Sequence, residues 1–231
     1  SEYVLNKGGV SVSKDTVLIN FDIGGTTSDI SILVNDPGDK RANLIRQTSA
    51  KIAANRMSTA AKFSKDLRKC IEYFVKKNQL NIKCLEEFDK NSNVSTYLLN
   101  IVFNKLEKNK IDGSLFYNQC WNPDDDTLDR GETRGLFAIA SYISGLLLFH
   151  TAQKVRGLIE NGELKQKKYH IKFNSFGKGG RLFDWLRNGV NESEANKYYE
   201  DCFRLGSQRD SNDLDIIASF GNYEVAENIK K

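Results

Sequence analysis

Residues 21–33 read FDIGGTTSDISIL, and this stretch decides the fold. Asp22 closes an apolar run, two glycines and three hydroxyl residues follow, and Asp29 opens a second apolar run. Continuous apolar residues on both sides of a glycine-rich turn are typical of two strands buried in a sheet and joined by a hairpin. We therefore predict two strands around a tight turn within residues 15–35.

The turn has the composition of a phosphate-binding loop. Gly24 and Gly25 lack a Cβ, so the backbone can take left-handed dihedrals and bring its N–H groups close to a ligand. Thr26 and Thr27 add hydroxyl donors. Asp22 could hold Mg²⁺ through water, or orient the water that attacks a terminal phosphate. These five residues are the first candidate site, with Asp22 as its catalytic and metal-binding member.

A plain β-hairpin turn is the alternative interpretation, because paired glycines and small polar residues are ordinary turn chemistry. A plain turn, however, does not need an aspartate at the end of an apolar strand. Burying or half-burying the Asp22 carboxylate costs free energy unless a metal or a ring of donors pairs with it. This cost favours the phosphate interpretation.

Farther along the chain, apolar residues recur at helical spacing. This spacing predicts helices over residues 47–78 and 83–109, then a loop over 112–131 that contains Pro123 and an acidic triplet. A long helix is predicted over 132–160, and the NGE that follows it should end it.

In the last third of the chain, predicted strands and helices alternate again. The pattern predicts a strand over residues 167–177, helices over 181–189 and 192–206, a strand over 213–220 and a final helix over 223–231. Strands separated by long helices indicate the α/β class.

A second glycine-rich loop lies where a strand should pass into a helix, in KFNSFGKGGRLFDWL, residues 172–186. The purely structural interpretation is a strand-to-helix turn, after which the apolar side chains of the helix pack on the sheet. Three glycines within four positions exceed what such a turn needs, so we favour a nucleotide contact. The candidate residues are Gly177, Lys178, Gly179, Gly180 and Arg181.

Composition narrows the class of protein. The 231 residues carry 34 basic and 30 acidic side chains, a net charge of +4, with no long block of one sign, so nothing demands nucleic acid or an anionic membrane surface. Four scattered cysteines and two isolated histidines argue against zinc or a disulfide framework, which favours a reducing cytoplasm. The charged N-terminal residues do not form a signal peptide.

A run of uncharged residues from 135 to 153 approaches the length of a membrane span. Ser141, Tyr142, Ser144 and His150 are among the polar residues that dilute it, and its pattern continues as an amphipathic helix. We therefore expect a long central helix packed on a sheet, and no membrane contact.

The hairpin FDIGGTTSDISIL resembles the phosphate-binding hairpin of the actin-like ATPase superfamily, which includes actins, heat-shock chaperone ATPases and sugar kinases. The matching residues are Asp22, Gly24, Gly25, Thr26, Asp29 and Ser31. KFNSFGKGGRLFDWL resembles the adenosine motif of that superfamily. The separation of the two motifs is similar to that between phosphate 2 and adenosine.

The resemblance implies roles for the second loop. Gly179 and Gly180 would let the backbone pass close under the ribose and base, and Arg181 would lie against the adenine or reach a phosphate. The family's adenosine loops often carry a hydroxyl residue after the glycines, whereas Arg181 follows directly here and Lys178 precedes them. The end of the chain, YEVAENIKK, resembles the family's last motif only weakly. ATP and Mg²⁺ are the implied cofactors.

The implied fold is a ribonuclease-H-like core, formed by residues 1–62 and 131–231, with an inserted, mainly helical subdomain over 63–130. The chain would be the C-terminal half of an actin-like ATPase, a fragment whose missing N-terminal half completes the cleft. Turnover of ATP is then expected of the whole protein and not of the fragment.

Several functions fit such a core. The first is a nucleotide-driven clamp in a bacterial protein of chaperone or cytoskeletal type, with a protein partner or self-association. The second is a small-molecule enzyme, since GGTTSD is also similar to the hairpin of hydantoinase-type and kinase-like ATP-coupled enzymes. The third is an interaction scaffold that kept the fold and lost turnover.

Overall fold

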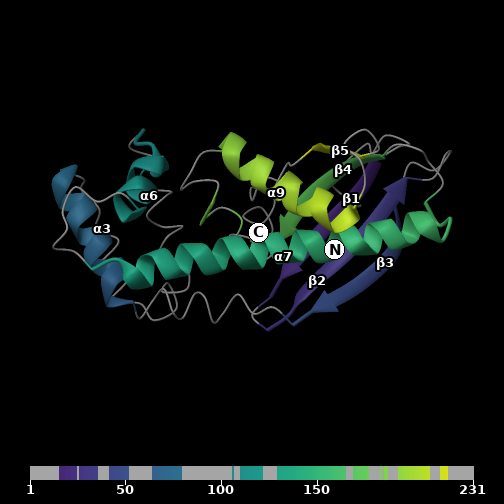
Figure 1. The fold of residues 1–231 in the computed structure, drawn as a ribbon, viewed down its shortest axis with the longest axis horizontal. Helices are drawn as coiled ribbons and strands as arrows, with labels where there is room; N and C mark the ends of the chain where they lie inside the picture. The colour runs from purple at the N-terminus through teal and green to yellow at the C-terminus, as the bar shows by residue number, and fades with distance from the viewer. Residues whose placement is uncertain are drawn as a thin grey trace, which may run out of the picture. The chain divides into compact units, whose positions relative to one another are not determined.

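The computed structural model describes residues 16–24, 26–35, 42–51, 64–79, 106, 110–121, 129–164, 169–176, 183, 185–186, 192–208 and 214–217. Over these residues the chain is α/β, with a mixed sheet and long helices (Figure 1). It forms two compact units: unit 1 holds residues 1–52, 145–180 and 199–231, and unit 2 holds residues 53–144 and 181–198.

Unit 1 contains the sheet. Its strands are β1 (Thr16–Ile23), β2 (Ser28–Asn35), β3 (Ala42–Ala50), β4 (Tyr169–Phe176) and β5 (Leu214–Ile217), in the order β3-β2-β1-β4-β5. The first three strands are antiparallel neighbours, and β4 and β5 run parallel to β1. Such parallel neighbours need crossover connections, which the long helices of the chain supply.

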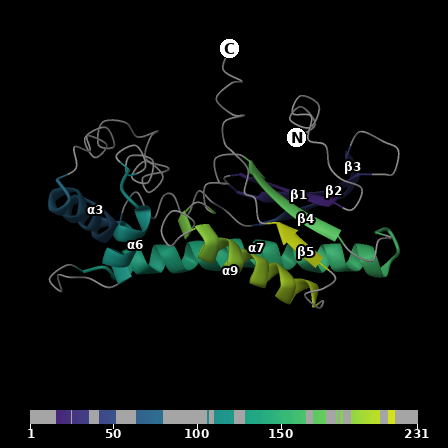
Figure 2. The same ribbon diagram turned by 90° about the horizontal axis from the view of Figure 1, so that it is seen from above.

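One face of this sheet is apolar. Phe21 of β1 stacks on Phe173 of β4, with 6.2 Å between ring centroids, and Phe173 meets Phe203 edge to face at 5.2 Å. Phe203 belongs to α9 (Glu192–Ser207). The part of α7 (Gly131–Glu160) that follows residue 144 lies on this face beside α9 (Figure 2).

The two helices approach each other closely in unit 1. A Cβ at Gly206 of α9 would collide with the carbonyl oxygen of Phe149 and would come within 2.9 Å of the Ala152 side chain. Only glycine fits there without displacing backbone. Thr151 is fully buried near this contact, and its hydroxyl donates to the Leu147 carbonyl at 2.7 Å, so the polar group is satisfied within the helix.

A glycine ends α7. Gly162 has φ of +74°, and the N–H of Glu163 donates to the Leu158 carbonyl at 2.9 Å. These features are typical of a helix that stops on a left-handed residue. The stop predicted at residues 161–163 is confirmed.

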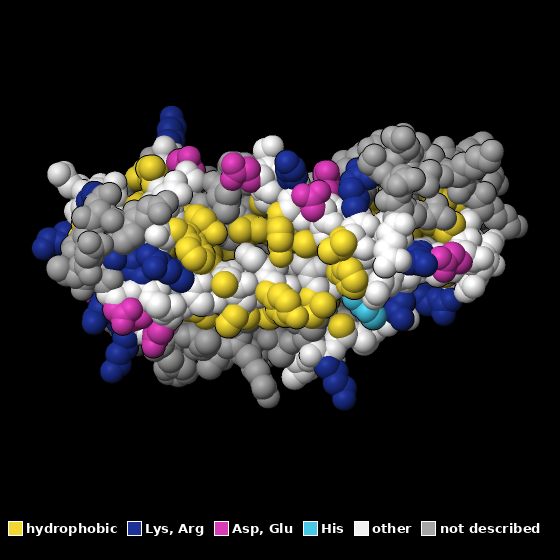
Figure 3. All heavy atoms as spheres, viewed as in Figure 1, with side chains coloured by type: hydrophobic (Ala, Val, Ile, Leu, Met, Phe, Trp, Pro, Cys, Tyr) yellow, Lys and Arg dark blue, Asp and Glu magenta, His cyan; other side chains and the backbone are white. Residues whose placement is uncertain are grey.

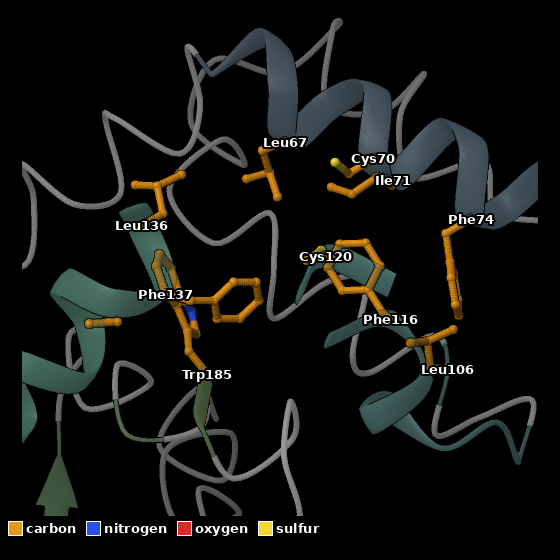
Figure 4. Close-up of a cluster of buried hydrophobic side chains, with 11 residues drawn as sticks. Leu67, Cys70, Ile71, Phe74, Leu106, Phe116, Cys120, Leu136, Phe137 and Trp185 are labelled. Atoms are coloured by element: carbon orange, nitrogen blue, oxygen red, sulfur yellow. The ribbon is translucent and has the colours of Figure 1, made fainter. Parts of the chain in front are cut away.

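Unit 2 is built around an apolar cluster between α3 (Lys65–Lys77), α6 (Gly113–Trp121) and the start of α7 (Figure 4). Phe74 and Phe116 meet edge to face at 5.4 Å. The buried members of the cluster are Leu67, Cys70, Ile71, Phe74, Leu106, Phe116, Cys120, Leu136, Phe137, Ala140 and Trp185.

The structure confirms most of the predicted elements. The two strands of 15–35, the long helix of 132–160, the strand of 167–177 and the helix of 192–206 are present, and β5 lies inside 213–220. The segments 83–109 and 181–189 are described only at single residues, and 223–231 lies outside the described residues.

Two predictions about elements are wrong. Residues 47–50 belong to β3 and not to a helix, because pairing with β2 holds them in the sheet. Residues 113–121 form α6, within a segment predicted to be loop. Compact packing units need not coincide with folding domains, so the expected core of 1–62 and 131–231, with its insertion at 63–130, stays a prediction.

By length and composition α7 could cross a membrane, and half of its most apolar window is buried in the protein. Figure 3 shows hydrophobic side chains along this helix, where Ile139, Tyr142 and Leu146 are exposed. Val155 and Leu158 are buried, as in the core helix of a soluble protein. A cytoplasmic location stays a prediction.

Candidate functional site

The turn predicted to bind phosphate is a short β-hairpin turn. Ile23 pairs with Ser28, and the N–H of Gly24 donates to the carbonyl oxygen of Thr27 at 2.8 Å. The Gly24 N–H is therefore used inside the turn. Gly24 does not have a left-handed φ, so its expected conformational role is wrong; a Cβ there would lie 3.2 Å from the Thr27 carbonyl oxygen. Gly25 lies outside the described residues.

The hydroxyl and carboxylate groups of the turn are open to a ligand. Thr26 is exposed and Thr27 is partly exposed, so either hydroxyl can reach a phosphate oxygen. Asp22 is exposed, whereas the other seven residues of β1 are buried. Because its carboxylate stays in water, the burial cost that favoured a bound metal does not arise, and this part of the sequence argument is wrong.

A second carboxylate stands beside Asp22. Asp29 is its direct partner in the β1–β2 ladder, so both side chains project from the same face of the sheet. Like charges directly opposite each other destabilise a sheet. Ser49 of β3 donates a hydrogen bond to Asp29 and relieves part of this repulsion. The arrangement gives two neighbouring carboxylates next to a hydroxyl-bearing turn.

Polar side chains continue across this face. Asn20 of β1 is only 4% exposed, and its Oδ1 accepts a hydrogen bond of 3.1 Å from Nδ2 of Asn174 on β4. Asn20 also pairs with Ser31, which pairs with Gln47 of β3. We call these four residues with Asp22, Asp29 and Ser49 the polar face of the sheet.

The second predicted motif starts from the same edge of the sheet. β4 ends at Phe176, whose partner in the parallel ladder is Asp22. The hairpin turn and the last described residue of β4 therefore lie at the carboxyl ends of two adjacent parallel strands, at one edge of the sheet. In open α/β sheets this edge is where ligands bind. Gly177, Lys178, Gly179, Gly180 and Arg181 lie outside the described residues.

The donors at the turn suit a hard cation held together with a phosphate. Asp22, Asp29, Thr26 and Thr27 offer only oxygen atoms, which Mg²⁺ prefers, and one or two carboxylates are enough when a nucleotide supplies the other ligands. No group of three or more His, Cys, Asp or Glu side chains that could hold a metal ion occurs in the part of the chain that the structure describes. The residues fit a shared magnesium site and not a self-contained one.

Sequence reasoning missed four members of the polar face: Asn20, Gln47, Ser49 and Asn174. Ser49 lies in a segment predicted to be helical, so its place opposite Asp29 could not be recognised. Asn174 lies in a predicted strand, and the signal for its role was one asparagine within each of two predicted strands, Asn20 being the other. Neither a comparison with models of protein families nor one with curated proteins finds a match to this chain.

Proposed function

We propose that this chain binds ATP with Mg²⁺ at the polar face of its sheet, as the half of an actin-like ATPase that carries the phosphate 2 hairpin and the adenosine loop. The observation that carries the proposal is the register of Asp22 with Phe176, because it puts the hairpin turn at the same edge as the end of β4, after which the second loop is predicted. The chain forms three antiparallel strands and then two parallel strands, each of which follows a helix. This order also supports a ribonuclease-H-like core.

The proposed chemistry assigns a role to each side chain of the turn. The hydroxyls of Thr26 and Thr27 donate hydrogen bonds to phosphate oxygens. The carboxylate of Asp22 accepts a hydrogen bond from the attacking water and holds it in line with the terminal phosphate. Mg²⁺, when bound, would neutralise charge on the phosphates. Asp29, held by Ser49, keeps a second negative charge beside Asp22.

This half supplies one wall of the site. Positioning both the water and the phosphates needs donors on two sides, and exclusion of bulk water needs a closed cleft. We therefore expect the 231-residue chain to bind Mg·ATP in the millimolar range and to hydrolyse it negligibly. Fast hydrolysis by the purified chain would contradict the two-walled site.

Asp22→Asn tests the carboxylate. The substitution keeps the shape and removes the charge, so calorimetric titration should show Mg·ATP affinity at least threefold weaker, about 0.7 kcal/mol. Without Mg²⁺ the substitution should no longer weaken the binding of ATP. It removes a negative charge beside the phosphates, so ATP should bind equally tightly or more tightly.

The matched control is Asp201→Asn, which removes an exposed carboxylate from α9, on the opposite side of the sheet. Its titration should be indistinguishable from that of the unmodified chain with and without Mg²⁺. If both variants change Mg·ATP affinity equally, the effect is one of net charge and Asp22 has no specific role.

A further inference from the structure

Two cysteines 50 positions apart in the sequence meet inside unit 2. Cys70 lies on α3 and Cys120 on α6, both fully buried in the same apolar cluster (Figure 4). Neither cysteine is in a disulfide. A buried free thiol usually serves as a small apolar group. Two of them in one cluster, on two helices that pack together, could in addition be joined by a disulfide.

The helices that carry the two thiols are held in place at their ends. Ser64 caps α3 by accepting from the Leu67 N–H at 3.1 Å, and its hydroxyl donates to Glu132 of α7 at 2.7 Å. Arg134 of α7 donates to the carbonyl oxygen of Cys120 at 2.8 Å and to that of Trp121 at 3.0 Å. Both thiols are thus positioned against the start of α7.

The surroundings make one sulfur the nucleophile. The Cys120 thiol donates a hydrogen bond to the Cys70 sulfur and so lowers the pKa of Cys70 to about 7, although burial acts in the opposite direction. The Thr133 hydroxyl, 3.7 Å from the same sulfur, and the guanidinium of Arg130 also favour the thiolate, while Asp66 opposes it. The pKa of Cys120 is raised because its proton is held by Cys70.

We propose that Cys70 and Cys120 form a redox-responsive dithiol, which a peroxide or a small-molecule disulfide oxidises to a disulfide that joins α3 to α6. Both side chains already lie in one buried cluster between α3 and α6, so a local adjustment of the two helices would bring the sulfurs to a bond length of about 2.05 Å. This site lies entirely in unit 2 and does not depend on the proposed binding of ATP.

The reaction with hydrogen peroxide balances in two steps. The Cys70 thiolate attacks one peroxide oxygen, an S–O bond forms, the O–O bond breaks, and the departing hydroxide takes a proton to become water. The Cys120 sulfur then attacks the Cys70 sulfur, the S–S bond forms, the S–O bond breaks, and the hydroxyl leaves as a second water with the Cys120 proton. Two thiols lose two electrons, and one peroxide gains them.

The test uses the whole chain with Cys84→Ser and Cys202→Ser, so that only the proposed pair remains. After treatment with equimolar hydrogen peroxide, intact mass should fall by two hydrogens, and peptide mapping should show Cys70 linked to Cys120. The melting temperature should rise by roughly 5–10 °C and return on reduction, because the bond restricts the unfolded chain. The rate of linkage should increase between pH 6 and pH 8 as Cys70 loses its proton.

Two controls keep the proposal open to contradiction. In the same background, Cys120→Ala should show neither the mass loss nor the rise in melting temperature. If that variant does not fold, peptide mapping of the oxidised unmodified chain is the control in its place. A sulfinic acid at Cys70 with Cys120 still reduced, or links only to Cys84 or Cys202, would overturn the proposal.

Discussion

The two faces of the sheet in unit 1 use the same strands for opposite purposes. On one face Phe173 packs against Phe21 and against Phe203 of α9, while on the other Asn20 and Asn174 share a hydrogen bond next to Asp22. Successive residues of a strand point to opposite faces, so one step along β4, from Phe173 to Asn174, changes the chemistry completely. The difference shows that β1 and β4 supply both an apolar face for the core and a polar face.

The largest change in the free energy of unfolding should come from a substitution on the apolar face. Phe173→Ala removes a fully buried ring from its contacts with Phe21 and Phe203, and we expect it to lower the free energy of unfolding by about 4 kcal/mol. Urea denaturation of both chains measures the change. Lys172→Ala, one residue away on the other face, should cost less than about 1 kcal/mol. Equal losses would mean that the two faces do not differ in burial as described.

A smaller effect should come from the polar face. Asn174→Ala removes the donor to Oδ1 of Asn20, which is buried, and we expect a loss of about 1–2 kcal/mol in the free energy of unfolding. A double-mutant cycle with Asn20→Ala isolates the pair, because the double variant leaves neither amide unpartnered. Strict additivity would show that the hydrogen bond contributes nothing.

The elements that sequence reasoning recovered are those whose own residues carry the signal. The strands of the hairpin are largely apolar, and α7 has a long apolar pattern that ends near a glycine, so both could be predicted without tertiary information. β3 could not. It is an edge strand with exposed side chains, such as Leu44 at 55%, and its conformation comes from pairing with β2.

α6 was missed for a different reason. Its surroundings are rich in polar and turn-forming residues, although Asp112 accepts a hydrogen bond from the Ser114 N–H, as an N-cap residue does. Phe116 and Cys120 are one helical turn apart and both buried, but this apolar pattern spans only nine residues. The placement of Cys120 in one buried cluster with Cys70 depends on how two helices pack, and no spacing in the sequence encodes it.

For the candidate site, the sequence predicted the position of the hairpin turn but not the exposure and charge of its side chains. The hairpin turn lies where predicted, and its register with β4 follows from the parallel pairing of two apolar strands. The exposure of Asp22 and the neighbouring charge of Asp29 could not be inferred, because they depend on which residues pair across strands. Pairing of Asp29 with Ser49 depends in turn on β3.

The central claim is that Mg·ATP binds at the polar face of the sheet, and an NMR titration of the backbone amides of the 231-residue chain tests it most directly. With millimolar Mg·ATP, the amide signals of Asp22, Thr26 and Thr27 should move progressively, while those of Phe203 and Gly206 beyond the apolar face stay fixed. Movement confined to the α9 signals, or no movement of the hairpin signals at saturating Mg·ATP, would contradict the claim.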